Sequence, residues 1–321
     1  MSLFDTSVTS RCNRPGGSSI TSPKRAAEEG KTDSRDVLTR PARPPDNVLS
    51  YGPQAEHIAD LRLPEPGPYR QRHDPPLPLV IFLHGGFWRA AFDRVHTGPL
   101  AAALVTAGFV VCTPEYRRTG QAGGGWPGTL DDVAAAVDVL PGLAAEATRG
   151  LVDPGRILLA GHSAGGHLAL WAASRSRLPP GIRWHQARPV AAGVVGLAAV
   201  CDLTACFAQG LGNGAAGELM GGGPARHPDR YAAADPARVL PIGIPVRLFH
   251  GTADDRVPCE MSRDYAARAQ AAGDDTVCAE LPGSGHFDVI DPLSAAWPHV
   301  VAAFRSPTFS AGPPAGGLGP P

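Results

Sequence analysis

The sequence predicts an α/β fold in which a mainly parallel central sheet carries helices on both faces. Short apolar runs alternate with longer runs of helical periodicity, an arrangement typical of parallel strands joined by helices. One apolar run leads through a glycine-rich turn directly into a helix-like run. The 321 residues are 43% hydrophobic, so the chain is long and apolar enough to bury a sizeable core.

The expected strands are short runs of mostly aliphatic residues. The six runs that fit the sheet best are residues 79–83, 109–113, 156–160, 190–200, 246–250 and 276–281. An earlier stretch, 55–63, contains Ile58, Leu61 and Leu63 and is expected to supply leading edge strands.

The expected helices lie between these strands. Residues 100–105 supply a crossover helix, and residues 167–173 form a helix after the glycine-rich turn. In residues 130–140, apolar side chains recur at helical spacing on one face. An amphipathic helix is expected after the last strand. The Gly-rich stretch 206–235 has no clear periodicity, and we expect it to form a small cap insertion over an active site.

Both ends of the chain differ in composition from its middle. Residues 1–45 are rich in Ser, Thr, Arg, Pro and Gly without apolar periodicity, which predicts a disordered N-terminal extension. Residues 306–321 are rich in Gly and Pro and predict a disordered C-terminal tail. A single domain is therefore expected over residues 46–305.

Composition narrows the function classes. The formal net charge of −1 argues against a nucleic acid or an anionic membrane as the main partner. No apolar run approaches the roughly 18–20 residues that span a bilayer, and the first residues lack a secretion-signal pattern, so a cytoplasmic protein is expected. The oligomeric state is left open, with a homodimer as one option. Scattered cysteines without metal-ligand spacing predict buried, reduced thiols and no metal site; they are Cys12, Cys112, Cys201, Cys206, Cys259 and Cys278.

A candidate nucleophile, Ser163, lies at the centre of the glycine-rich turn 161–166. The turn follows the strand run 156–160, which is the setting in which a G-x-S-x-G pattern carries chemistry. The backbone at such a serine is strained and lifts the hydroxyl clear of the sheet. The flanking positions must be glycine because any side chain there would collide with neighbouring backbone.

A serine hydroxyl needs a base in hydrogen-bond reach and a carboxylate that orients the base. In this architecture the chain order is serine, acid, histidine, with the latter two on loops after later strands. Asp254 follows the strand 246–250 and is the expected acid, with Asp255 as its rival, read otherwise as a solvated or helix-capping carboxylate. His286 follows the last strand and is the expected base.

The oxyanion of an acyl-transfer intermediate needs backbone donors. The N–H of Ala164 follows the nucleophile at a helix N-terminus, where the helix dipole assists. Further donors are expected from the loop His84-Gly85-Gly86-Phe87-Trp88, whose glycines allow the backbone to approach a substrate.

These motifs resemble those of the α/β-hydrolases, over most of residues 48–305. HGGFW at 84–88 together with GHSAGG at 161–166 resembles the carboxylesterase and kynurenine formamidase (arylformamidase) branch. The resemblance implies that the amides of Gly86 and Phe87 complete the oxyanion hole. PEYRR at 114–118 and GWPG at 125–128 also look like segments of these relatives.

The chain departs from two neighbouring groups of the same fold. Hormone-sensitive-lipase-like esterases carry HGGG and usually GDSAGG, whereas Phe87 and His162 stand at the corresponding positions here and imply a bulkier pocket floor. HGTADDRVP at 250–258 resembles loops of prolyl-oligopeptidase-type peptidases. Those carry a large β-propeller that the first 45 residues cannot build, so peptidase activity is disfavoured.

Several other residues have competing interpretations. Trp88 and Phe87 either line the acyl pocket or pack beneath the loop, and His84 is expected to order that loop. Tyr116 and Arg117 follow a strand C-terminus, where ligands sit in open α/β sheets. Arg117 either meets a substrate carboxylate or forms a surface ion pair. The side chain of His162 is expected to point away from the serine hydroxyl and to be structural.

The sequence therefore predicts a serine hydrolase that cleaves a small carboxylic ester through Ser163, His286 and Asp254, without a metal or organic cofactor. The close alternative is an arylformamidase that hydrolyses N-formylkynurenine. An alternative of a different class is a non-catalytic α/β-hydrolase-fold protein that binds a small molecule.

Overall fold

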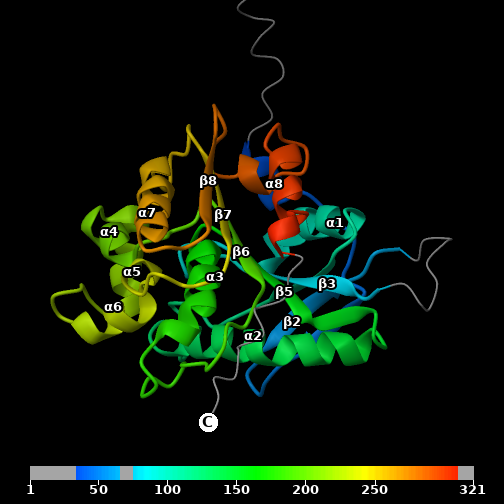
Figure 1. The fold of residues 1–321 in the computed structure, drawn as a ribbon, viewed down its shortest axis with the longest axis horizontal. Coiled ribbons are helices and arrows are strands. Elements are labelled where there is room, and N and C mark those ends of the chain that lie inside the picture. Colours follow the sequence, from blue (N-terminus) through cyan, green and yellow to red (C-terminus); the bar gives the residue numbers. More distant parts are fainter. Residues whose placement is uncertain (1–33, 66–74, 310–321) are drawn as a thin grey trace, which may run out of the picture. The chain divides into compact units, whose positions relative to one another are not determined.

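The computed structural model describes residues 34–65 and 75–309, and one eight-stranded sheet organises them (Figure 1). The strand order is β1-β2-β4-β3-β5-β6-β7-β8. The pairs from β4 to β8 are parallel, whereas β1 and β2 add an antiparallel edge. The strands are β1 (Asn47–Ser50), β2 (Ile58–Arg62), β3 (Leu77–Leu83), β4 (Val110–Pro114), β5 (Val152–His162), β6 (Gly193–Leu197), β7 (Val246–Gly251) and β8 (Thr276–Leu281). The prediction of a mainly parallel α/β sheet is confirmed.

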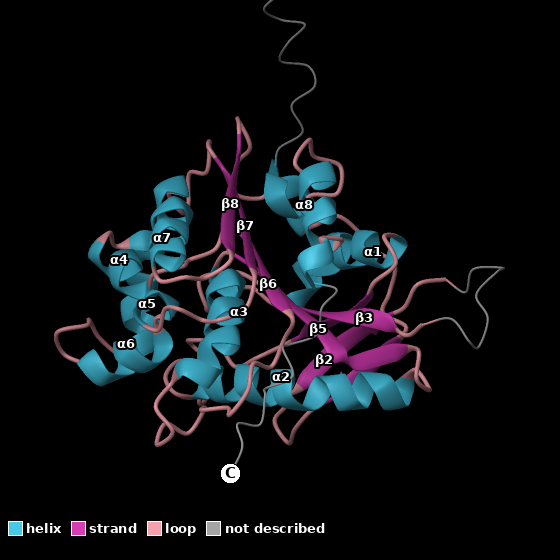
Figure 2. Ribbon diagram, in the orientation of Figure 1, coloured by secondary structure: helices cyan, strands magenta, loops and turns pink. Residues whose placement is uncertain are grey.

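Helices cover both faces of this sheet (Figure 2). They are α1 (Gly98–Thr106), α2 (Gly128–Ala147), α3 (Ala164–Ser174), α4 (Leu203–Ala208), α5 (Leu211–Met220), α6 (Pro228–Ala234), α7 (Cys259–Ala271) and α8 (Trp297–Phe304). Short 3₁₀ turns lie at Ser34–Leu38, Arg94–Thr97, Arg175–Arg177, Pro236–Arg238, Asp288–Ile290 and Pro307–Phe309. Helix α7 lies where the sequence patterns indicate no element.

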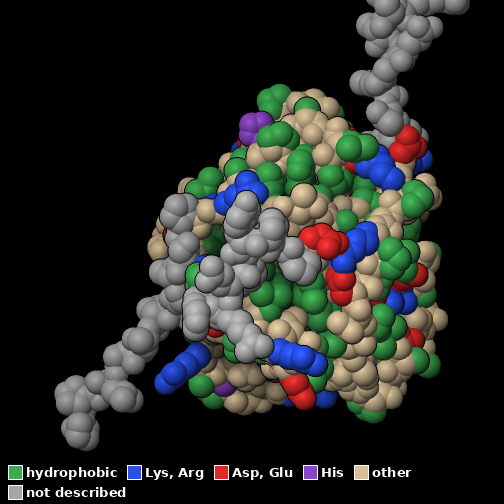
Figure 3. Space-filling view, turned by 90° about the vertical axis from the view of Figure 1, so that its right-hand side faces the viewer, with side chains coloured by type: hydrophobic (Ala, Val, Ile, Leu, Met, Phe, Trp, Pro, Cys, Tyr) green, Lys and Arg blue, Asp and Glu red, His purple; other side chains and the backbone are tan. Residues whose placement is uncertain are grey.

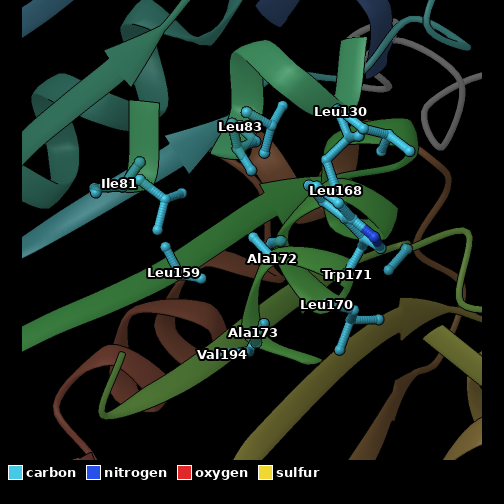
Figure 4. Close-up of a cluster of buried hydrophobic side chains, with 14 of the residues drawn as sticks. Ile81, Leu83, Leu130, Leu159, Leu168, Leu170, Trp171, Ala172, Ala173 and Val194 are labelled. Carbon is cyan, nitrogen blue, oxygen red and sulfur yellow. The ribbon is translucent and has the colours of Figure 1, made fainter. Parts of the chain in front are cut away.

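Strand alternation divides the core into two layers. Along β3, Ile81 and Leu83 face the cluster that contains α2, α3 and α7, whereas Phe82 faces the cluster that contains α1 and α8. Figure 4 shows the first cluster, where Leu168 and Trp171 of α3 pack against the sheet. Because α3 is buried at every position, the turn that precedes it is held rigidly.

The expected cap region is helical rather than irregular. Helices α4, α5 and α6 occupy it, and α5 begins with left-handed residues at Gly212, Asn213 and Gly214. This left-handed start explains why the sequence shows no helical periodicity there. The Nε1 of Trp171 donates to the carbonyl of Ala233 at 2.9 Å and ties the insertion to α3.

The expected domain boundaries are too narrow at both ends. The composition of residues 34–45 predicts disorder, yet Val37 is buried in the α1/α8 cluster. At the other end, Phe309 is buried in the same cluster. Both corrections have one cause: a few apolar residues inside a polar, Pro-rich stretch find partners far away in sequence. The rest of the two expected tails, 1–33 and 310–321, lies outside the described residues.

The surface carries mixed charges, and the described cysteines are free thiols. Basic and acidic side chains are interspersed with hydrophobic ones on the face drawn in Figure 3, in keeping with the formal net charge of −1. Within 34–65 and 75–309, no helix combines the length and hydropathy needed to cross a membrane. Five of the six cysteines are described, and all five are free thiols, four of them buried.

Candidate active site

Ser163 lies on a sharp turn between β5 and α3. Its φ and ψ are 55° and −119°, a conformation that is costly for a residue with a side chain. A Cβ at Gly161 would lie 2.1 Å from the carbonyl oxygen of Gly165, and one at Gly165 would lie 2.0 Å from that of Leu83. Both positions must therefore be glycine, and the strained turn has the geometry that the sequence predicts.

His286 and Asp254 are joined by a hydrogen bond. The distance from His286 Nδ1 to Asp254 Oδ2 is 2.7 Å, and neither side chain is more than 4% exposed. Asp255, by contrast, is 71% exposed and pairs with Arg256. The structure thus selects Asp254 over its rival as the partner of His286.

The Asp254 carboxylate is stabilised in its charged form. The amides of Arg256 and Val257 donate to its Oδ1 at 2.8 and 2.9 Å. Burial alone would raise the pKa of Asp254, but hydrogen bonds from His250 and His286 outweigh it and hold the pKa well below its usual range. The carboxylate is therefore ionised at neutral pH.

His250 is a supporting residue whose role the sequence does not reveal. Its Nε2 lies 2.9 Å from the carbonyl of Val257 and 3.2 Å from Asp254 Oδ2, so this nitrogen carries the proton. Its Nδ1 accepts from Ser262 Oγ at 2.7 Å. These contacts fix the loop that presents Asp254.

A small pocket of about 80 Å³ brings the candidate residues together. Four predicted residues line it, namely Ser163, His286, Gly86 and Phe87. His162, which the motif comparison placed at the pocket floor, also lines it. The remaining lining residues, to which the sequence gives no pocket role, are Leu38, Phe92, His96, Arg256 and Phe287. The pocket wall is mostly apolar, with one arginine.

The loop after β3 has an unusual backbone. Gly86, Phe87 and Trp88 have φ values of 110°, 50° and 56° in succession. Among residues 34–65 and 75–309, the N–H groups of Gly86 and Phe87 have no hydrogen-bond acceptor. Two free donors on a strained loop beside a serine are the arrangement that an oxyanion hole requires.

A buried network holds this loop in place. The Oε1 of Glu115 lies 2.8 Å from His84 Nε2, and its Oε2 accepts from the N–H of Arg94 at 3.1 Å. The hydroxyl of Tyr116 donates to the carbonyl of His84 at 2.7 Å. Burial would raise the pKa of Glu115, yet its hydrogen bond with His84 and nearby positive charge lower it.

Trp88, Tyr116 and Arg117 do not line this pocket, so their assignment to the substrate pocket is wrong, whereas the competing interpretations, packing for Trp88 and an ion pair for Arg117, agree with the structure. Trp88 and Tyr116 are fully buried, and the Tyr116 hydroxyl bonds to the backbone of the loop 84–88. The Arg117 guanidinium and amide are taken up by Asp132 of α2, at 2.6–3.1 Å. The arginine that does reach the pocket is Arg256.

His162 also lies in the pocket wall. Its Nε2 donates to the carbonyl oxygen of His286 at 2.9 Å, and the two rings lie 4.6 Å apart. Its Nδ1 is buried without a hydrogen-bond partner in the described part of the chain. Burial, together with the closeness of His286, lowers the pKa of His162 well below its usual value, so the His162 ring is neutral.

The chain matches one family model and is similar to several esterases. The BD-FAE family model matches residues 68–268. Esterase LipQ of Mycobacterium tuberculosis is 29% identical over 253 residues, which is 75% of this chain and 57% of that protein. Isoprenylcysteine alpha-carbonyl methylesterase ICME of Arabidopsis thaliana is 28% identical over 265 residues, 76% of this chain and 57% of that protein. The chain therefore spans less than two thirds of the length of these curated relatives.

Solved structures share the fold. A truncated carbohydrate esterase from gut microbiota superposes with a TM-score of 0.66 at 20% identity, over 84% of this chain and 100% of that one. The apo form of Thermogutta terrifontis esterase 2 gives a TM-score of 0.62 at 23% identity, over 82% of this chain and 94% of that one. Together with the sheet order, these neighbours identify the α/β-hydrolase fold.

Proposed function

The chain belongs to the BD-FAE family and has the α/β-hydrolase fold, and from this premise we propose that it is a serine carboxylesterase. The observation that carries the proposal is the 2.7 Å contact between Asp254 and His286, where His286 lines the same pocket as a strained Ser163. A nucleophile, a base and an orienting acid in this order along the chain are typical of acyl transfer.

In the proposed first step, Ser163 Oγ attacks the ester carbonyl carbon while His286 Nε2 takes the hydroxyl proton. Asp254 keeps the other ring nitrogen protonated and stabilises the imidazolium that forms. The carbonyl oxygen becomes an oxyanion and accepts hydrogen bonds from the amides of Gly86, Phe87 and Ala164. Collapse of this intermediate breaks the bond to the alcohol oxygen, which takes the proton from His286.

In the second step, water replaces the alcohol. His286 removes a proton from the water as its oxygen attacks the acyl carbon, and the same amides hold the second oxyanion. Breaking the bond to Ser163 Oγ returns the proton to the serine and releases the acid. Both steps use only side chains and backbone amides of this chain and one water molecule.

The size of the pocket supports a short acyl group. About 80 Å³ bounded by Phe87, Phe92 and Phe287 accommodates an acetyl-sized substituent more readily than a long chain. Arylformamidase activity is the second candidate, and Arg256 is the observation that favours it. Its side chain is 40% exposed at the pocket and offers a cation to the carboxylate of N-formylkynurenine.

Hydrolysis of p-nitrophenyl acetate and of N-formylkynurenine, measured in parallel, tests the two activities. We expect steady turnover of the ester and a loss of at least about 10⁴-fold in kcat in Ser163→Ala. A fluorophosphonate probe labels Ser163 in an active enzyme, and Ser163→Ala is its control. A folded wild-type chain that neither turns over the ester nor reacts with the probe would instead be the non-catalytic binding protein.

A further inference from the structure

The N-terminal segment, residues 34–40, is fastened to the body of the domain. Val37 is 1% exposed and packs in the apolar cluster that contains Val289 and Ile290. In Figure 1 this segment, in blue, lies beside α8, which belongs to the same cluster. A segment with such a buried anchor has a defined position even though its composition is polar and Pro-rich.

An ion pair ties the same segment to the loop that carries His286. Arg40 donates through both terminal nitrogens to the two oxygens of Asp291, with the Nη2–Oδ2 distance at 2.9 Å. Asp291 Oδ1 also accepts from the amide of Leu293 at 2.8 Å. The carboxylate is only 9% exposed and the arginine side chain 23% exposed, so water screens this bidentate pair weakly.

Leu38 is placed by these two anchors, which lie on either side of it. Its side chain lines the pocket that contains Ser163 and His286, together with Phe92 and Phe287. Because the pocket is only about 80 Å³, removing one wall of it changes the available volume substantially.

We propose that Leu38 is a specificity-determining residue that limits the length of the acyl group, and that the Arg40–Asp291 pair positions it. The proposal rests on the esterase activity proposed above. The segment is not a disordered extension but part of the substrate site, closed onto the His286 loop by a contact between residues 251 positions apart.

The test measures kcat/KM for p-nitrophenyl acetate, butyrate and octanoate in Leu38→Ala and in the wild-type chain. We expect the octanoate-to-acetate ratio to rise about 10-fold in Leu38→Ala, the scale of a methylene-sized change in an apolar pocket. Leu38→Phe should lower the butyrate-to-acetate ratio. The matched control is Leu293→Ala, whose side chain is 79% exposed and outside the pocket, and its ratios should equal those of the wild type.

The ion pair is tested in the same assay. Asp291→Asn should raise the octanoate-to-acetate ratio in the direction of Leu38→Ala, with its melting transition measured to establish that it folds. A second series, acetate esters of alcohols of increasing size, checks which half of the ester lies against Leu38. Unchanged acyl ratios in both Leu38 variants, or a shift confined to the alcohol series, would overturn the inference.

The wild-type and Ser163→Ala rates test the proposed esterase activity, whereas the Leu38 variants test only the acyl-length specificity. A wild type that hydrolyses the acetate ester and loses this activity in Ser163→Ala establishes the esterase, whatever the Leu38 variants do. If the wild type hydrolyses none of the esters, the proposed function fails and the assignment of Leu38 fails with it.

Discussion

His162 Nε2 lies 2.9 Å from the carbonyl oxygen of His286. The residue directly before the proposed nucleophile Ser163 is therefore hydrogen-bonded to the backbone of the proposed base. The elbow and the histidine loop come from β5 and from the segment after β8, and this bond joins them directly. The arrangement makes His162 a positioning residue, since it acts on the reaction through His286.

Replacing His162 by alanine is expected to lower kcat by about 10- to 100-fold with little change in KM, because misplacing a catalytic group costs rate rather than binding. Steady-state kinetics on p-nitrophenyl acetate measure the split, and the fluorophosphonate labelling rate should fall in parallel. His299→Ala, at an exposed position, is the control. A His162→Ala variant that folds and keeps wild-type kcat contradicts this role.

Asp254 and Asp255 give a matched pair of variants. Asp254→Asn should reduce kcat by about 10³- to 10⁴-fold, because an amide that donates to Nδ1 forces the proton of His286 onto Nε2, where a base must be free. Asp255→Asn should change kcat less than twofold, since that carboxylate is 71% exposed. The two rate constants on the same ester decide the assignment, and equal losses in both variants would refute it.

How far the sequence predicts the site depends on whether the determinant is local. The elbow is readable because Gly161 and Gly165 stand at fixed offsets from Ser163 after a buried strand. The sequence favours Asp254 as the acid but leaves Asp255 as its rival, because the choice depends on amides of the same turn that draw one side chain inward.

The position of Leu38 at the pocket depends entirely on residues that are distant in the sequence. Its pocket partners are 48 or more positions away in the chain, and apart from Val37 its near neighbours are polar, charged or proline, so no periodicity marks it. For a related reason the sequence leaves Arg117 with two interpretations, because a strand end also suits a ligand-binding arginine. Asp132, which takes up that arginine, lies on a helix whose orientation only packing decides.

Glu115 should make stability depend on pH. Its pKa is lowered in the folded state, so the ionised carboxylate contributes stability above the unfolded value of about 4.3, and this contribution is lost as the pH falls through the folded value. Glu115→Gln should unfold with a free energy lower by about 1–3 kcal/mol at pH 7, because a buried hydrogen-bonded charge is removed. Urea unfolding at pH 7 and pH 3.5 should show this gap narrowing at the lower pH.

The exposed Glu146 of α2 is the control for that experiment, because its carboxylate has no buried partner among residues 34–65 and 75–309. Glu146→Gln should follow the wild type at both pH values. A Glu115→Gln gap that stays constant down to pH 3.5 would show that the carboxylate carries no linked stability.

Arg256 should discriminate substrates by charge. Arg256→Gln is expected to lower kcat/KM for 4-acetoxybenzoate by about 5- to 10-fold and to leave p-nitrophenyl acetate nearly unchanged, because only the first substrate has a carboxylate for the guanidinium. Salt should reduce the wild-type preference, since an exposed charge pair is screened at high ionic strength. Equal effects on the two esters would assign Arg256 a structural role instead.

Alanine variants of Gly212 and Gly214 in α5 distinguish two effects on the loop 84–88: backbone strain within α5 and a direct clash with the Phe87 side chain. Both have left-handed backbones, with φ of 59° and 81°, so alanine at either site should cost about 1 kcal/mol of stability. A Cβ at Gly212 would lie 2.6 Å from the ring of Phe87, whereas one at Gly214 meets nothing within 4 Å.

Gly212→Ala must therefore displace Phe87, whose N–H is a proposed oxyanion donor. The kcat of this variant should fall about 10- to 100-fold, which is less than the full loss of such a donor. Gly214→Ala should keep the wild-type kcat at a similar melting temperature, and a loss of rate common to both variants would trace the effect to the helix backbone rather than to Phe87.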